Sequence, residues 1–316
     1  MNFHFLFSNI GDLTVTGLSQ GAIYALIALG YTLVYGLLKL INFAHSEVFM
    51  MGTFGALIAW NLTGLHENDP TPSLPMMVVY LLVGLVGAMV WSGVTALTVE
   101  FVAYRPLRRR NAPRLVFLIT AIGASVAISE AVGVITSRNQ YGMPDLFKTT
   151  NLATIGNVHI TNVDLGVVVA AVVMMVVLDQ FINRTRLGRG IRAVAQDPDT
   201  AALMGINKNR VIVLTFALGG VMAGAAALLY NLKIGVTRAD IGFLLGIKAF
   251  TAAVLGGIGN LRGALLGGLA LGLVENYGSA LFGTSWRDVV AFVVLVVILM
   301  FRPTGLLGES LGKARA

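Results

Sequence analysis

The sequence predicts an all-α integral membrane protein. Hydrophobic residues make up 56% of the 316 residues and charged residues 12%, and the mean hydropathy is +0.82, well outside the range of soluble domains. Apolar stretches of roughly 17 to 25 residues recur along the chain, and each is about long enough as a helix to cross a ~30 Å hydrocarbon core. Because so many stretches cannot all be buried in one soluble core, we expect the bilayer to be the solvent.

Nine apolar stretches are predicted to span the membrane. They cover residues 10–37, 46–62, 76–102, 114–136, 163–182, 211–231, 242–258, 263–282 and 287–301. The first is long and the seventh is short, so a re-entrant or broken helix at either place would change the count to eight or ten. We expect a single transmembrane domain over residues 1–316, without a clear internal repeat.

The distribution of Lys and Arg predicts which loops face the cytoplasm. Of the 22 Lys and Arg, five lie in Arg105–Arg114, six in Arg184–Arg210 and three after Phe301. Cytoplasmic loops are enriched in these residues, so we place all three segments inside, with a cytoplasmic C-terminus. Counting spans backward then places the N-terminus outside, together with the loops at residues 66–75 and 137–162.

The sequence argues against several classes of function. It contains no cysteine, which removes disulfides, thiolate catalysis and cysteine-based metal sites together. It has no Gly-x-x-x-x-Gly-Lys-Ser/Thr string, so we expect no ATP to bind to this chain. No combination of nucleophile, base and metal ligands suggests an intramembrane enzyme. We therefore expect no catalytic residue, no metal site and no cleaved signal peptide, since no Lys or Arg precedes Lys39.

The longest cytoplasmic loop, Arg184–Arg210, contains a short capped helix. Asp197 followed by Pro198 is a helix start, because the carboxylate can cap free amides and proline suits the first helical position. Gly205 is the matching stop. So short a helix is marginal alone in water and needs a surface to pack against. A groove on a partner protein would suit it, and so would the membrane surface, with the flanking arginines meeting anionic lipid.

Residues 242–282 consist of two short apolar pieces interrupted by glycine. Small residues recur four positions apart, at Gly263 and Gly267 and again at Gly268 and Gly272. This pattern is typical of a discontinuous helix beside a transport path, and equally of close helix packing.

A polar cluster precedes the second span. Asn42, His45 and Glu47 are predicted to lie at its cytoplasmic end. Since Ser46 and Glu47 suit a helix start, we expect a capping or interfacial role there.

Four stretches of the chain strongly resemble the membrane subunits of ABC importers for branched-chain and related amino acids, and among them the high-affinity leucine, isoleucine and valine permeases. The stretches are YTLVYGLLKLINFAHSEVFMMGTF from Tyr31, GRGIRAVAQDPDTAALMGI from Gly188, KAFTAAVLGGIGNLRGALLGG from Lys248 and RPTGLLG from Arg302. The resemblance implies a type II importer permease fold, a bundle of about eight to ten transmembrane helices with a cytoplasmic coupling helix.

In that family a coupling element meets the ATPase, and the resemblance places it within the cytoplasmic loop at residues 184–210. The residues that would carry it are Asp197, Pro198, Ala201, Ala202, Leu203, Met204 and Gly205.

The resemblance also implies partners and a location. The chain would form half of a path for branched-chain or related amino acids across the cell inner membrane, in contact with lipid. A second, similar permease subunit would form the other half. Two cytoplasmic ATPase subunits would bind ATP and Mg, and a periplasmic binding protein would deliver the solute. The clustering of Lys and Arg in three segments separately indicates membrane topology and not a nucleic-acid partner. Two alternatives stay open: a permease of the same family for urea or short amides, and a stand-alone secondary transporter or channel.

Three ionisable residues fall within or near apolar spans, namely Glu130, Lys248 and Glu275. Such groups are costly in a membrane and usually face a partner or a water-filled path. We favour an internal ion pair that fixes helix packing over a contact in the pathway, because a transporter fed by a binding protein needs only a low-affinity path.

Overall fold

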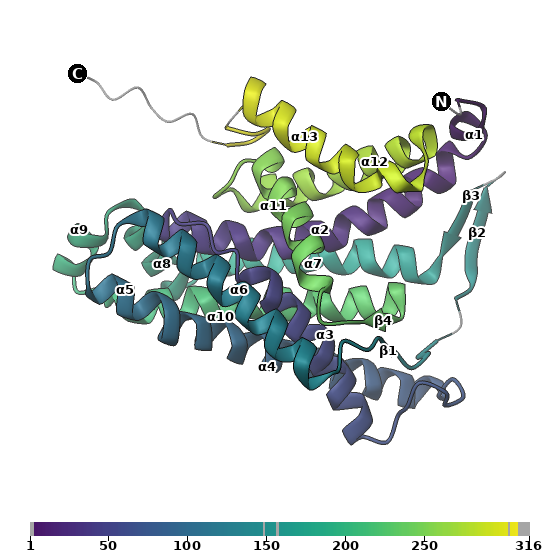
Figure 1. The fold of residues 1–316 in the computed structure, drawn as a ribbon, viewed down its shortest axis with the longest axis horizontal. Helices are drawn as coiled ribbons and strands as arrows, with labels where there is room; N and C mark the ends of the chain where they lie inside the picture. Colours follow the sequence, from purple (N-terminus) through teal and green to yellow (C-terminus); the bar gives the residue numbers. More distant parts are fainter. Residues whose placement is uncertain (1–2, 148, 156–157, 303, 309–316) are drawn as a thin grey trace. The chain divides into compact units, whose positions relative to one another are not determined.

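The computed structural model describes residues 3–147, 149–155, 158–302 and 304–308. It is 78% helical with little sheet, so the predicted all-α class is confirmed. The helices, drawn in Figure 1, are α1 (Phe3–Ser8), α2 (Ile10–Leu38), α3 (His45–Leu62), α4 (Leu74–Val99), the π-helix η1 (Glu100–Tyr104), α5 (Arg105–Arg109), α6 (Arg114–Ile135), α7 (Asn162–Arg184), α8 (Arg186–Gln196), α9 (Pro198–Leu203), α10 (Lys208–Ile234), α11 (Ile241–Gly256), α12 (Leu261–Phe282), the 3-10 helix η2 (Thr284–Trp286) and α13 (Arg287–Phe301).

Helices lie at all nine predicted stretches, but not all of them are long and apolar enough to cross a membrane. Among the described residues, seven helical segments meet that requirement: Ile10–Leu38, Leu74–Arg109, Arg114–Ile135, Asn162–Arg184, Lys208–Ile234, Leu261–Phe282 and Thr284–Phe301. Of the other two, α11 has only 16 residues and α3 opens with three polar ones. The expected eight to ten spans therefore exceed the count that length and composition support.

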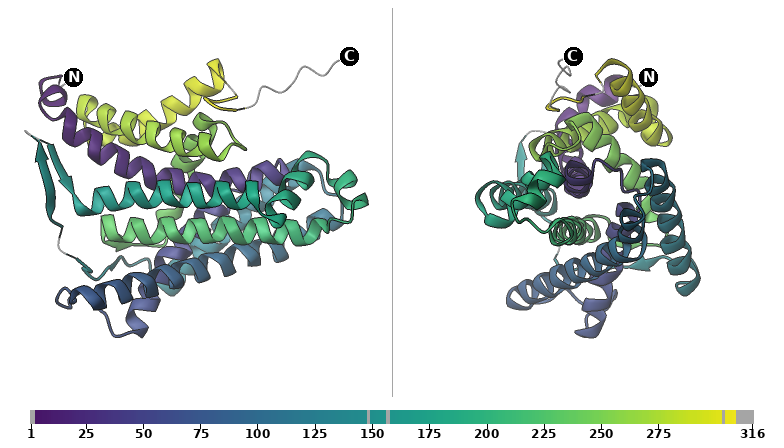
Figure 2. Two further views of the ribbon diagram at one scale, coloured as in Figure 1. Left: turned by 180° about the vertical axis from the view of Figure 1, so that it is seen from behind. Right: turned by 90° about the vertical axis from the view of Figure 1, so that its left-hand side faces the viewer.

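The chain divides into two compact units. Unit 2 comprises Leu33–Thr150 and Gln180–Ile247. Within it α3, α4 and α10 run side by side (Figures 1 and 2). Glycine permits the close approach, since a Cβ on Gly224 of α10 would lie 2.5 Å from the carbonyl oxygen of Ala88 on α4.

Unit 1 comprises Met1–Thr32, Asn151–Asp179 and Lys248–Ala316. Its glycines make close helix contacts: a Cβ on Gly268 of α12 would lie 2.5 Å from the backbone of Ala25 on α2, and one on Gly267 would lie 2.6 Å from the amide nitrogen of Gly256 on α11. The glycine spacing at residues 263–272 thus reflects close packing, the second of the two interpretations drawn from the sequence.

The described residues contain four short strands that were not predicted: three lie in residues 137–162, which were expected to form a loop, and the fourth lies between two predicted spans. In unit 2, β1 (Tyr141–Gly142) pairs antiparallel with β4 (Val236–Thr237). In unit 1, β2 (Asn151–Ile155) pairs antiparallel with β3 (Val158–Thr161). Strands this short carry too little periodicity to be recognised in a sequence.

The second predicted span, residues 46–62, coincides with α3 but begins at a different depth in the bundle from the one expected. Ser92, near the middle of the long segment Leu74–Arg109, donates a hydrogen bond to the carbonyl oxygen of Val48 at 2.8 Å. Ser125, near the middle of α6, donates to Glu47 Oε1 at 3.1 Å. The start of α3 is therefore level with the middle of two long helices, roughly 16 Å from either end of α6 at 1.5 Å per residue, and not at an end of the bundle.

Candidate functional site

The segment after α7 begins with the amphipathic helix α8. Thr185 caps it, because its hydroxyl accepts a hydrogen bond from the amide of Gly188 at 3.0 Å. Ile191 and Val194 are buried and belong to the apolar core of unit 2. Because Asp197 is both the C-cap of α8 and the N-cap of α9, the buried residues of α8 also hold the start of α9 against unit 2.

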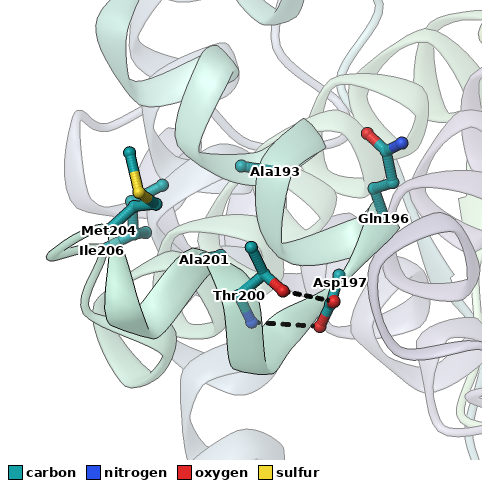
Figure 3. A pocket seen from close by; sticks show the side chains of 7 residues that line it. All are labelled: Ala193, Gln196, Asp197, Thr200, Ala201, Met204 and Ile206. Carbon is teal, nitrogen blue, oxygen red and sulfur yellow. Dashed lines mark hydrogen bonds between the residues drawn. The ribbon is translucent and has the colours of Figure 1, made fainter.

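The helix α9 starts at Pro198 and is capped by Asp197, as the sequence predicted (Figure 3). Asp197 Oδ1 accepts from the amides of Asp199 at 2.9 Å and Thr200 at 3.1 Å, and Oδ2 accepts from the Thr200 hydroxyl. The Thr200 hydroxyl bond, followed by the two amide bonds, lowers the pKa of the Asp197 carboxyl below its ordinary value. The cap therefore stays ionised at neutral pH.

The end of α9 also lies where the sequence placed it. Gly205 has φ +84°, a left-handed conformation that favours glycine. The amide of Ile206 then bonds to the carbonyl oxygen of Ala201 at 3.0 Å, which closes the helix.

The two sides of α9 differ sharply in burial. Ala201 is 5% exposed and packs into the apolar core with Tyr104 and Phe216. Leu203 and Met204 are 88% and 80% exposed. A pocket of ≈ 380 Å³ lies beside the helix (Figure 3) and is lined by Ala193, Gln196, Asp197, Thr200, Ala201, Met204 and Ile206. α9 is therefore anchored on one side and presents apolar side chains on the other, with Ala202 also exposed.

In unit 1, two of the three predicted ionisable residues are brought together. Lys248 Nζ on α11 lies 2.8 Å from Glu275 Oε1 on α12, and Glu275 is fully buried. Arg287 Nε lies 2.7 Å from the same carboxylate oxygen, and Asp288 Oδ1 lies 2.6 Å from Lys248 Nζ. Two cations and two carboxylates thus alternate in one network, with Lys248 also 5.8 Å from the centre of the Tyr24 ring.

Arg287 and Asp288 were not predicted to be site residues, although they are the first two residues of the last apolar stretch. Glu130, the third predicted residue, does not belong to this network. It pairs with Arg138 at 2.5 Å, and the two side chains are 53% and 68% exposed. Glu130 is therefore not in a buried pair.

The expected capping role of the polar cluster before the second span is also wrong. The N-cap of α3 is Ala44, which provides no side-chain cap, and Asn42, His45 and Glu47 are all at least 97% buried. Asn42 instead accepts a hydrogen bond from the hydroxyl of Tyr104 at 3.1 Å. The three residues belong to the interior of unit 2, since α3 begins in mid-bundle.

A second buried ion pair went unpredicted. Glu100, fully buried in η1, lies 2.5 Å from Arg108 Nη2. The basic residues from Arg105 onward were expected to form a loop. They begin instead as the helix α5, which follows α4 and η1 without a break. For the residues described, no group of three or more His, Cys, Asp or Glu is placed to hold a metal ion.

Comparison with known proteins identifies the family. A family model described as branched-chain amino acid transport system / permease component matches residues 13–299. The chain is 44% identical over 298 residues to the high-affinity branched-chain amino acid transport system permease protein BraD of Pseudomonas aeruginosa, covering 93% of this chain and 94% of the relative. It is 41% identical over 301 residues to the permease protein LivH of the same kind from Escherichia coli, with the same coverage. The chain is therefore a member of the family of permease components of branched-chain amino acid transport systems.

Proposed function

We propose that this chain forms half of the translocation path of an ATP-driven ABC importer for branched-chain amino acids, which a periplasmic binding protein delivers. Family membership and the names of its relatives support the solute class. On this proposal the chain is a transport subunit and not an enzyme, and ATP and Mg bind to separate chains.

The observation that carries the proposal is that α9 is a capped and anchored helix with an exposed apolar end. The helix is capped at both ends, anchored by Ala201, and ends in two exposed apolar side chains, Leu203 and Met204. Exposed apolar side chains on a rigid, anchored helix are suited to a groove on a partner protein. We infer that the partner is the ATPase subunit, that two such subunits serve two permease chains, and that the second permease is a similar chain.

Reconstitution with the cognate binding protein, the second permease and the ATPase tests the proposal. We expect uptake of leucine, isoleucine and valine that requires both ATP and the binding protein. Uptake of urea or a short amide in place of leucine would instead support the related permease class. Leucine uptake that persists without the ATPase would identify a stand-alone transporter or channel.

The orientation in the inner membrane can be tested with single cysteines, because the chain has none of its own. The excess of Lys and Arg in residues 105–114, 184–210 and the tail supports a cytoplasmic position for these segments and for the C-terminus. In intact cells we expect Asp69→Cys to react with an impermeant thiol reagent and Arg109→Cys to react only after the cells are opened. Reaction of Arg109→Cys in intact cells would reverse the proposed topology.

A further inference from the structure

Glu47 is a buried carboxylate at mid-height of unit 2. It is 1% exposed and lies in the first turn of α3, level with the middle of α6. Glu47 is thus an ionisable group deep in the bundle. In a membrane protein, burial of such a group is costly unless a partner compensates its charge.

Compensation of this carboxylate is incomplete. Oε1 accepts a hydrogen bond from Ser125 at 3.1 Å and a long one from Ser46 at 3.4 Å, and the Ser46 hydroxyl also donates to the carbonyl oxygen of Phe43 at 2.7 Å. Oε2 is buried and has no hydrogen-bond partner. Over the described part of the chain, no Lys, Arg or His forms an ion pair with Glu47.

The start of α11 faces the unpartnered oxygen. A Cβ on Gly242 would lie 2.5 Å from Glu47 Oε2, so only a glycine fits this close to the carboxylate. Ser129 on α6 donates to the carbonyl oxygen of Ala239, just before α11, at 3.0 Å. Since Ser125 and Ser129 are one helical turn apart, α3 and α11 both begin beside the middle of α6.

Two helices that begin in mid-bundle, with irregular backbone before each, are the arrangement in which membrane transporters hold their solute. Asp240, immediately before α11, also carries a carboxylate, and that carboxylate is already paired with Arg238 at 2.9 Å. An additional positive charge is therefore the group that this position lacks.

We propose that Glu47 Oε2 receives the α-ammonium group of the transported amino acid at mid-membrane. The inference rests on the proposed function, since an amino acid supplies the missing positive charge and urea or an amide does not. Because Gly242 covers Oε2 in this structure, the ammonium group reaches it when the start of α11 moves away from α3.

The first test removes the charge and retains the shape. In the reconstituted complex, Glu47→Gln keeps the acceptor for Ser125 but cannot bind an ammonium group electrostatically. We expect leucine uptake to fall at least about tenfold, equivalent to the loss of roughly 1.4 kcal/mol of interaction. Glu130→Gln, on an exposed side chain of α6, is the matched control and is expected to transport like the wild type.

The second test measures access to the site with Glu47 in place. Ser125→Cys is expected to react with a small cationic methanethiosulfonate reagent faster during ATP-driven leucine uptake than at rest. Val90→Cys, on an exposed apolar face of α4, is expected to react slowly in both conditions.

The outcomes separate this inference from the proposed function. If the wild-type complex does not take up leucine, the proposed function fails and this inference fails with it. If the wild type takes up leucine and Glu47→Gln does so equally well, only the inference is overturned. A Glu47→Gln chain that does not assemble, together with a Ser125→Cys chain that never reacts, would assign Glu47 to packing and also overturn it.

Discussion

Leu203→Asp is expected to abolish ATP-dependent uptake while leaving insertion into the membrane unchanged. Leu203 is 88% exposed at the end of α9, so an aspartate there disturbs little within the chain itself. In the proposed complex the same side chain lies in an apolar groove of the ATPase. Burial of an unpaired carboxylate in such a groove costs several kcal/mol, about enough to prevent docking.

Co-purification of the ATPase with the permease measures this directly, beside leucine uptake in the same membranes. Lys208→Ala is the control: Lys208 lies just beyond the helix stop and pairs with Asp199 at 2.9 Å on the surface. Exposed ion pairs of this kind contribute about 0–1 kcal/mol to the stability of the fold. We therefore expect Lys208→Ala to retain nearly normal ATPase co-purification and leucine uptake. If Leu203→Asp retains both the ATPase and uptake, α9 lies on the membrane surface and does not dock.

The sequence predicted the elements whose signals are local. Apolar length located nine helices, and Asp197, Pro198 and Gly205 marked both ends of α9 correctly, because capping depends on neighbours in the chain. The role of α9 in coupling stays a prediction, which the Leu203→Asp experiment tests.

Features that depend on the tertiary fold were not predictable in the same way. Hydropathy reports how long an apolar stretch is but not the depth at which it begins, so α3 was expected to start at a membrane surface and starts in mid-bundle. Glu275 acquires its partners from α11 and α13, and no spacing along the chain reveals that Arg287 lies beside it. The strands β2 and β3 are too short to produce a recognisable alternation.

Lys248→Met is expected to reduce assembly and uptake far more than Lys233→Met, near the end of α10. The side chain of Lys248 is 9% exposed and neutralises Glu275, at 2.8 Å, and Asp288, at 2.6 Å. Loss of one member of a buried pair destabilises a protein by about 3–5 kcal/mol, because the remaining charge is stranded. Arg287 still contacts Glu275, so we expect an effect near the lower end of that range. Wild-type behaviour of both variants would show that Lys248 reaches water and needs no buried partner.

A double substitution distinguishes a structural ion network from a contact with the solute. In the wild type, Lys248 and Arg287 balance Glu275 and Asp288, and Lys248→Met leaves one negative charge in excess. Adding Glu275→Gln restores neutrality, with Arg287 and Asp288 as the remaining charges. If the network only fixes the packing of α11, α12 and α13, the double variant should assemble better than Lys248→Met alone, a coupling that a double-mutant cycle measures. If Lys248 or Glu275 contacts the solute, the double variant should assemble normally and still fail to transport leucine.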